Sequence, residues 1–205
     1  MFTNFPKVTI IVRGYTYEQV RLIACILAES KINSIEIALN SPDAINTIKR
    51  IADEFGEDLF VGAGTVLNLD DAKKAIDAGA KFLLSPIVFS EEICEYAKDQ
   101  GVVTVSGACS PTEIYRSIQN GSNIVKVFPA ARLGSKYISD VLAPFGEVPI
   151  MAVGGINEEN VNEFISAGAK YVGLGSGILN REHILNNRKT ELKNAIRRLQ
   201  KKVIG

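Results

Sequence analysis

The chain has 205 residues, 46% of them hydrophobic and 22% charged, which suits one large domain or two small ones. Its 23 basic and 23 acidic residues cancel, which argues against a nucleic-acid-binding face or a membrane-surface patch. We find no apolar run near the ~18 residues of a membrane span, no secretory signal in Met1–Thr16 and no CxxC among the three cysteines. These features predict a cytoplasmic protein without a disulfide framework.

Eight short runs rich in β-branched and other apolar residues recur along the chain, and segments of helical period lie between them. Regular alternation of this kind predicts parallel strands joined by crossover helices. The predicted strands are Val8–Val12, Ser34–Ala38, Leu59–Val61, Phe82–Leu84, Val102–Val105, Ile124–Phe128, Pro149–Val153 and Tyr171–Leu174.

Capping signals mark the ends of the helices predicted between these strands. Capping boxes begin at Thr16 and Ser110, each with a glutamine or glutamate three residues later. Glycines directly after helical segments predict several helix ends. The set also includes N-cap signatures at Ser41-Pro42-Asp43 and Asn68, end signals at Gly79, Gly121 and Gly168, and a last amphipathic helix over Asn187–Lys202.

Eight strand–helix units without a linker predict a single (β/α)8 TIM barrel over residues 1–205. The alternative is an open doubly wound sheet. A GxGxxG turn after the first strand would favour it, but Arg13-Gly14-Tyr15-Thr16 stands there. Because active sites of the barrel fold lie at the C-terminal ends of the strands, those ends hold the candidate functional residues.

Two charged residues, Glu36 and Lys126, stand inside predicted strands. We expect both to point into the barrel, because the dry layer under the helices is the worse place for a charge. The alternative is a structural ion pair, or an amine that reaches out of the mouth. A buried pair adds little to stability, which favours a function. Burial lowers the pKa of a lysine, and a neutral amine can attack a ketone while a carboxylate moves the protons.

Glycine-rich turns follow the last two predicted strands, where this fold often binds phosphate. They are Gly154-Gly155 and Gly173-Leu-Gly175-Ser176-Gly177. Glycine lets backbone N–H groups approach an anion, and a short helix could start at Ser176. These turns therefore predict a phosphate site.

Two more residues at the predicted mouth suit an anionic substrate. Arg13 offers a fixed positive charge and Thr65 a hydroxyl. The alternatives are a rim salt bridge for Arg13 and a helix cap for Thr65. The only histidine, His183, lies in a polar stretch, and one histidine does not make a zinc site. We therefore expect no metal.

Eight short motifs, in order along nearly the whole chain, point together to one enzyme family, although each alone is weak. They are Val12-Arg13-Gly14, Ile35-Glu36-Ile37, Val61–Val66, Leu84-Ser85-Pro86, Ser110–Glu113, Val125–Pro129, Val153-Gly154-Gly155 and Gly173–Ser176. With these motifs the chain resembles the class I aldolases that act on 2-keto-3-deoxy-6-phosphoaldonates.

The resemblance implies roles for the residues that match. Lys126 would form a Schiff base with the substrate, Glu36 would be the general acid and base, and no metal or organic cofactor would be needed. Thr65 would contact the pyruvate carboxylate. By the strand period of two, Phe128 faces the same way as Lys126 and could pack against the bound keto acid. The family also implies a homotrimer, and phosphate contacts at Gly154, Gly155, Gly175 and Ser176.

Two positions bear on the C4 configuration of the substrate. Enzymes of the 6-phosphogluconate type commonly carry an arginine shortly after the glutamate and a threonine before the glycine pair. Asn40 and Val153 stand there instead, which is more similar to the 6-phosphogalactonate branch. A methyl in place of a hydroxyl changes which C4 hydroxyl orientation can be hydrogen-bonded. We expect cleavage of 2-dehydro-3-deoxy-6-phosphogalactonate to pyruvate and D-glyceraldehyde 3-phosphate. The alternative is a 2-dehydro-3-deoxy-6-phosphogluconate and 4-hydroxy-2-oxoglutarate aldolase.

Two other functions remain open on the same barrel, since fold does not fix function. One is a phosphosugar isomerase or epimerase, which usually needs paired carboxylates or a metal, whereas Glu36 is the only acid inside a predicted strand. The other is a non-catalytic barrel that binds a phosphosugar.

Overall fold

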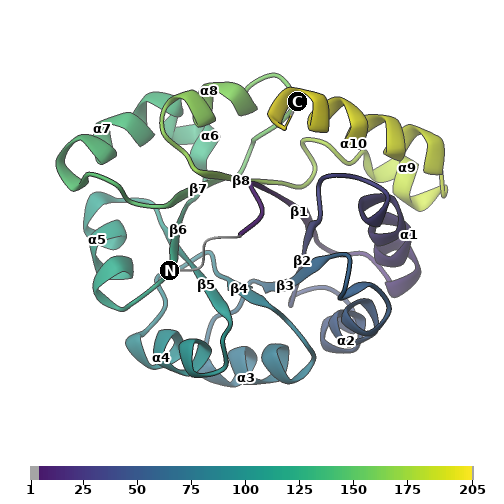
Figure 1. Ribbon diagram of the computed structural model, residues 1–205, viewed down its shortest axis with the longest axis horizontal. Helices are drawn as coiled ribbons and strands as arrows, with labels where there is room; N and C mark the ends of the chain where they lie inside the picture. The colour runs from purple at the N-terminus through teal and green to yellow at the C-terminus, as the bar shows by residue number, and fades with distance from the viewer. Residues whose placement is uncertain (1–4, 205) are drawn as a thin grey trace.

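The computed structural model describes residues 5–204. Eight parallel strands form a closed barrel in which each strand pairs with the next and β8 pairs with β1 (Figure 1). The predicted TIM barrel is therefore confirmed. The strands are β1 (Val8–Val12), β2 (Ser34–Ala38), β3 (Phe60–Gly64), β4 (Phe82–Leu84), β5 (Val103–Ala108), β6 (Ile124–Val127), β7 (Ile150–Val153) and β8 (Tyr171–Leu174).

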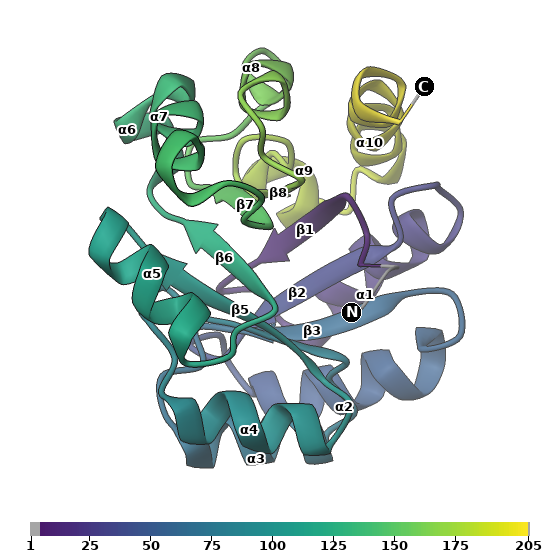
Figure 2. The same ribbon diagram turned by 60° about the vertical axis from the view of Figure 1, so that its left-hand side comes forward.

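The helices surround the strands as an outer ring (Figure 1). α3 and α4 lie side by side along one flank (Figure 2), and α10 packs against α1. None of the described helices is long and apolar enough to cross a membrane. The helices are α1 (Tyr17–Ala28), α2 (Ala44–Phe55), α3 (Leu69–Asp77), α4 (Glu91–Asp99), α5 (Pro111–Gln119), α6 (Ala130–Leu133), α7 (Ser135–Phe145), α8 (Val161–Ser166), α9 (Arg181–Leu185) and α10 (Lys189–Val203).

Two strands extend further than predicted, at their C-terminal ends. β3 continues to Gly64 and β5 to Ala108, through glycine, alanine and serine residues that have little β propensity of their own. Pairing with the adjacent strand holds them, since Gly64 pairs with Ala38 of β2 and Ala108 with Val127 of β6. The neighbouring strands, and not local propensity, set where these two strands end.

Most capping signals are confirmed. The Glu113 carboxylate accepts from the N–H of Ser110 at 2.8 Å, and the Asn68 side chain accepts from the N–H of Asp71 at 2.9 Å. The signature at Ser41-Pro42-Asp43 is confirmed as a helix start, since Asp43 is the N-cap residue of α2, although its side chain makes no capping hydrogen bond. The Ser41 hydroxyl accepts from the Gly14 N–H at 2.9 Å, and so it links the turn after β1 to the turn after β2.

Two other predicted helix starts were wrong. The residues after β8 form a single turn, in which the carbonyl of Gly175 accepts from the N–H groups of Ile178 and Leu179. No helix therefore starts at Ser176. Helix α9 begins at Arg181, where the Asn180 side chain caps it. The last helix begins at Lys189, because Asn187 has a left-handed backbone with φ of 51°.

Apolar side chains fill the barrel between its N-terminal end and the strand C-termini. At the N-terminal end, Phe5 makes edge-to-face contacts with the rings of three aromatic residues, at centroid distances of 5.2–5.6 Å. These are Phe60, Phe82 and Tyr171, and each is the first residue of its strand. The filling leaves room for a ligand at the other end of the barrel.

Candidate active site

A cavity of about 550 Å³ opens at the C-terminal ends of the strands. Its lining comes from β1, β2, β6, β7 and β8 and from the turns that follow them. Nine of the ten predicted site residues lie in the lining: Arg13, Glu36, Lys126, Phe128, Val153, Gly154, Gly155, Gly175 and Ser176. The topology therefore brings together residues that are up to 163 positions apart in the sequence (Arg13 to Ser176).

Lys126 is buried in β6, with 4% of its surface exposed, and its side chain enters the cavity. Its Nζ lies 4.8 Å from the centre of the Phe128 ring. Burial lowers the pKa of Lys126 to about 8; the nearby carboxylate of Glu36 acts to raise it and Arg13 to lower it further. At pH 7 roughly a tenth of this amine is therefore neutral, far more than of an ordinary lysine, and the neutral form is the nucleophile.

Glu36 lines the same cavity from β2, on the opposite side of the barrel from β6. It is 1% exposed, and neither carboxylate oxygen has a hydrogen-bond partner among the described residues. Burial raises the pKa of Glu36 to about 7, while Lys126 and Arg13 act to lower it. A carboxyl with this pKa can both accept and donate a proton near neutral pH.

Arg13 and Thr65 lie next to each other at the mouth, although only Arg13 lines the cavity. Arg13 Nη2 donates to Thr65 Oγ1 at 3.4 Å. The rim salt bridge and the helix cap, which were the alternatives for these two residues, are not found within residues 5–204. Arg13 has no ion pair there, and α3 is capped by Asn68 and not by Thr65. Thr65 therefore contacts a lining residue without lining the cavity itself.

The two glycines after β7 have backbones that suit glycine alone, with φ of 94° at Gly154 and 78° at Gly155. A β-carbon on Gly154 would lie 2.9 Å from the Phe128 ring, and one on Gly155 would lie 2.6 Å from the side chain of Ala131. The chain here runs tightly against the residues that follow β6. Gly175 and Ser176 line the neighbouring part of the cavity.

The sequence prediction missed several residues of the lining, and two of them, Tyr15 and Arg181, bear on the chemistry of the opening. The guanidinium of Arg181 lies 5.8 Å from the centre of the Tyr15 ring, so a second cation stands at the opening. The signal was available in part, because Tyr15 comes two residues after Arg13 and Arg181 comes five residues after Ser176. Loop residues carry no periodicity, however, that would show which way they point.

The chemistry of the cavity rests on few groups. Among the residues that line it, Glu36 is the only carboxylate and Lys126 the only primary amine. No cluster of three or more His, Cys, Asp or Glu side chains in the described part of the chain could hold a metal ion. A lysine with a lowered pKa and a carboxyl with a raised pKa can form and hydrolyse an imine on a carbonyl substrate. A pair of carboxylates, as many isomerases use, is not present in this lining.

Comparison with known proteins gives the family of this arrangement. A family model described as aldolase, KDPG and KHG aldolase, matches residues 3–195. The 2-dehydro-3-deoxy-6-phosphogalactonate aldolase of Escherichia coli K12 is 30% identical over 177 residues, which cover 86% of this chain and 85% of the relative. The 2-dehydro-3-deoxy-phosphogluconate aldolase of Treponema pallidum is 34% identical over 145 residues, 70% of this chain and 68% of the relative.

A solved structure is similar along nearly the whole chain. It is the KDPG aldolase of Legionella pneumophila, with pyruvate captured at low pH as a covalent carbinolamine intermediate. The TM-score is 0.84 at 26% identity, and the match covers 93% of this chain and 92% of that one.

Proposed function

Since the chain belongs to the KDPG and KHG aldolase family, whose members are class I aldolases, we propose that it cleaves a 2-dehydro-3-deoxy-6-phosphoaldonate to pyruvate and D-glyceraldehyde 3-phosphate. We propose Lys126 as the Schiff-base residue and Glu36 as the general acid and base. The observation that carries this assignment is that the cavity holds one buried amine and one buried carboxyl, with pKa values moved toward each other.

The reaction begins with the neutral amine of Lys126, which attacks the C2 ketone; loss of water then gives an iminium ion. Glu36, through a water molecule, removes the proton of the C4 hydroxyl. The C3–C4 bond breaks, its electron pair moves to the iminium, and the aldehyde product leaves behind an enamine. Glu36 returns a proton to C3, and water hydrolyses the imine to free pyruvate and the lysine.

Arg13 supports this chemistry through its charge. Its positive charge favours the ionised form of Glu36 and the neutral form of Lys126, which are the forms that the first steps use. It also provides a cation for the carboxylate of the keto acid, together with the Thr65 hydroxyl that it contacts. Phe128, which packs near Lys126 Nζ, would cover the apolar face of the bound keto acid.

The part of the lining that follows β7 and β8 is proposed to hold the phosphate. Backbone groups of Gly154, Gly155 and Gly175 and the hydroxyl of Ser176 can approach an anion closely. Arg181, at the same opening, adds a positive charge. Glu36, the only carboxylate in the lining, is buried, whereas Gly155 and Ser176 are exposed.

For the C4 configuration we propose the 6-phosphogalactonate type. Val153 supports this choice, because its apolar side chain lines the cavity where the other branch is expected to carry a threonine hydroxyl. Asn40 does not line the cavity and adds no support. The 6-phosphogluconate and 4-hydroxy-2-oxoglutarate activities are the second candidate, since a phosphogluconate aldolase is 34% identical to this chain.

Two measurements test the proposal. Borohydride added with pyruvate should attach a stable adduct to Lys126, located by peptide mass; an adduct on a different lysine, or none, would remove Lys126 from the mechanism. Rates on the two C4-epimeric phosphates, measured side by side through lactate dehydrogenase, then decide the branch. A higher kcat/KM on the gluconate epimer would overturn the galactonate preference and leave the aldolase assignment intact.

We also propose that the protein is a homotrimer, as expected from the family resemblance. Light scattering coupled to gel filtration tests this directly. A mass of one or two chains would contradict it.

A further inference from the structure

The carboxylate of Glu36 occupies space that a side chain at position 64 would fill. A β-carbon on Gly64 would lie closer to Glu36 Oε1 than the length of a covalent bond, and 2.9 Å from its Cγ. An overlap of this size is not relieved by a shift of a few tenths of an ångström. The carboxylate of Glu36 would have to move elsewhere.

The backbone does not explain why residue 64 is a glycine. Gly64 is the last residue of β3, pairs with Ala38, and is absent from the glycines with positive φ. Its carbonyl accepts from the Leu39 N–H at 2.8 Å, an ordinary bond between neighbouring strands. Any residue could adopt this conformation, so what distinguishes glycine here is the missing side chain.

Gly62, two residues earlier on the same face of β3, provides a direct comparison. A β-carbon on Gly62 would overlap the ring of Phe82, to which its three nearest atoms all belong. The inner wall of β3 therefore has two side-chain-sized spaces, one filled by an aromatic ring of the core and the other by the carboxylate.

The packing around Glu36 decides where its carboxylate lies, because no hydrogen bond from the described residues holds it. Both oxygens lack a partner among the described residues. A buried carboxylate is normally oriented by donors, and here the backbone wall of β3 limits where it can go. We propose that Gly64 is a positioning residue, whose missing side chain places the Glu36 carboxylate for proton transfer at C4 and C3. This inference rests on the proposed aldolase function.

The test separates imine formation from proton transfer. In Gly64→Ala, borohydride trapping of pyruvate on Lys126 should stay within about threefold of wild type. Turnover, and exchange of the pyruvate methyl protons with D2O, should each fall by about 10²-fold or more, the range for losing a general acid or base. Gly62→Ala is the matched control, and should lower the unfolding temperature while kcat per folded enzyme stays within a few fold.

Rescue then distinguishes positioning from general damage. Aspartate is one methylene shorter than glutamate, so Glu36→Asp combined with Gly64→Ala should recover turnover at least about tenfold over Gly64→Ala alone, a non-additive result for residues in contact. If Gly64→Ala is too unstable to assay, the unfolding temperatures of the single and double variants test the contact between the two residues. Glu36→Ala added to Gly64→Ala should then restore much of the lost stability.

The outcomes are separable from those of the proposed function. Undiminished turnover and exchange in Gly64→Ala, an equal loss of adduct formation, or no recovery in either double variant would each overturn the role of Gly64. Absence of any adduct on Lys126 in the wild-type enzyme would overturn the aldolase mechanism itself.

Discussion

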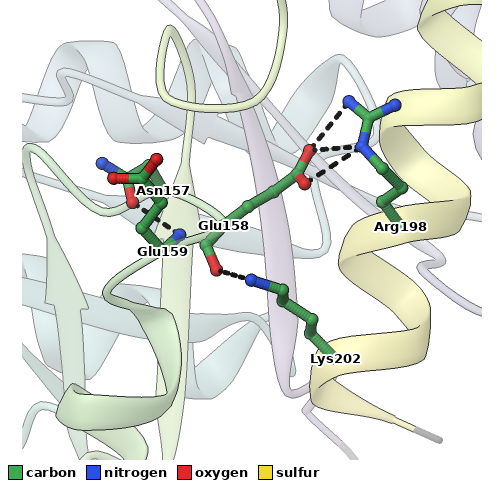
Figure 3. A network of polar contacts seen from close by, with 5 residues as sticks. All are labelled: Asn157, Glu158, Glu159, Arg198 and Lys202. Carbon is green, nitrogen blue, oxygen red and sulfur yellow. Dashed lines mark hydrogen bonds and ion pairs between the residues drawn. The ribbon is translucent and has the colours of Figure 1, made fainter.

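Two carboxylates of this chain, Glu158 and Glu36, lie in opposite surroundings. Glu158 follows β7 at the surface, where Nε and Nη2 of Arg198 donate to it at 3.0–3.2 Å (Figure 3). Lys202 Nζ donates to its backbone carbonyl at 2.6 Å. These contacts join the loop after β7 to α10. Glu36 has no donor among residues 5–204 and is only 1% exposed.

The difference shows that the surface carboxylate joins two parts of the fold, whereas the buried one suits chemistry. At the surface a paired charge gains little, because water already solvates both partners. In the interior a charge without donors is unfavourable and is retained where its shifted pKa is useful. Stability alone would favour the opposite arrangement, with donors around the buried carboxylate. We therefore expect substitution of Glu36 to lower activity and raise stability. Substitution in the surface pair should lower stability and leave activity unchanged.

The largest contrast should be between the two lysines. Lys126→Met should abolish the borohydride adduct and lower turnover by on the order of 10⁴-fold or more, because no other group in the cavity can form the imine. Lys202→Met should leave turnover unchanged, since its ammonium bonds only the loop backbone. A coupled assay with lactate dehydrogenase measures both. Comparable losses in the two variants would contradict the assignment.

The next contrast is between the carboxylates. Glu36→Gln should lower kcat by about 10²–10⁴-fold and still allow the pyruvate adduct on Lys126, because imine formation and C–C cleavage use different groups. Glu158→Gln should turn over at the wild-type rate. Full activity of Glu36→Gln would exclude Glu36 from the proton transfers.

The pH dependence of adduct formation gives a third contrast. Since the pKa of Lys126 is lowered to about 8, the rate of trapping should rise with pH and level off above about 8, well below the 10.5 of an ordinary lysine. The negative charge of Glu36 raises this pKa, so Glu36→Gln should move the midpoint to lower pH. Arg13 lowers it, so Arg13→Gln should move the midpoint up. Glu158→Gln should not move it, and shifts in the reverse directions would rule out this electrostatic account.

Stability should respond in the opposite sense to activity. The folded-state pKa of Glu36 is raised from 4.5 to about 7, so the folded form binds more protons than the unfolded one between these values. Stability from this group therefore falls as pH rises from 4.5 through about 7. Glu36→Gln should be more stable than wild type by about 1–3 kcal/mol at pH 8 and by little at pH 5. Thermal unfolding at the two pH values measures this, and equal differences at both would contradict it.

The smallest effect belongs to the surface pair. Arg198→Gln should lower the free energy of unfolding by less than about 1 kcal/mol, and the loss should shrink in high salt. Denaturant titration at low and high salt checks it. A loss that is larger and independent of salt would show that this pair is not the solvated contact described here.

The sequence predicted the strands well because each is an apolar run, and Glu36 and Lys126 were visible because they interrupt such runs. The ends of β3 and β5 were missed because cross-strand pairing, not propensity, sets them. Tyr15 and Arg181 were missed because loop side chains have no period. The space at Gly64 could not be seen either, since it depends on how β3 lies against the side chain of Glu36.

The aromatic cluster around Phe5 has a kinetic consequence. Because apolar side chains fill the barrel from that end upward, the cavity connects to solvent at the strand C-termini, with Lys126 at its base and Ser176 and Arg181 at its rim. Ligands that share one opening must leave in the reverse of the order in which they bind. Under the proposed mechanism the phosphorylated aldehyde must depart while pyruvate is still bonded to the enzyme, and in the synthetic direction pyruvate must enter before the aldehyde.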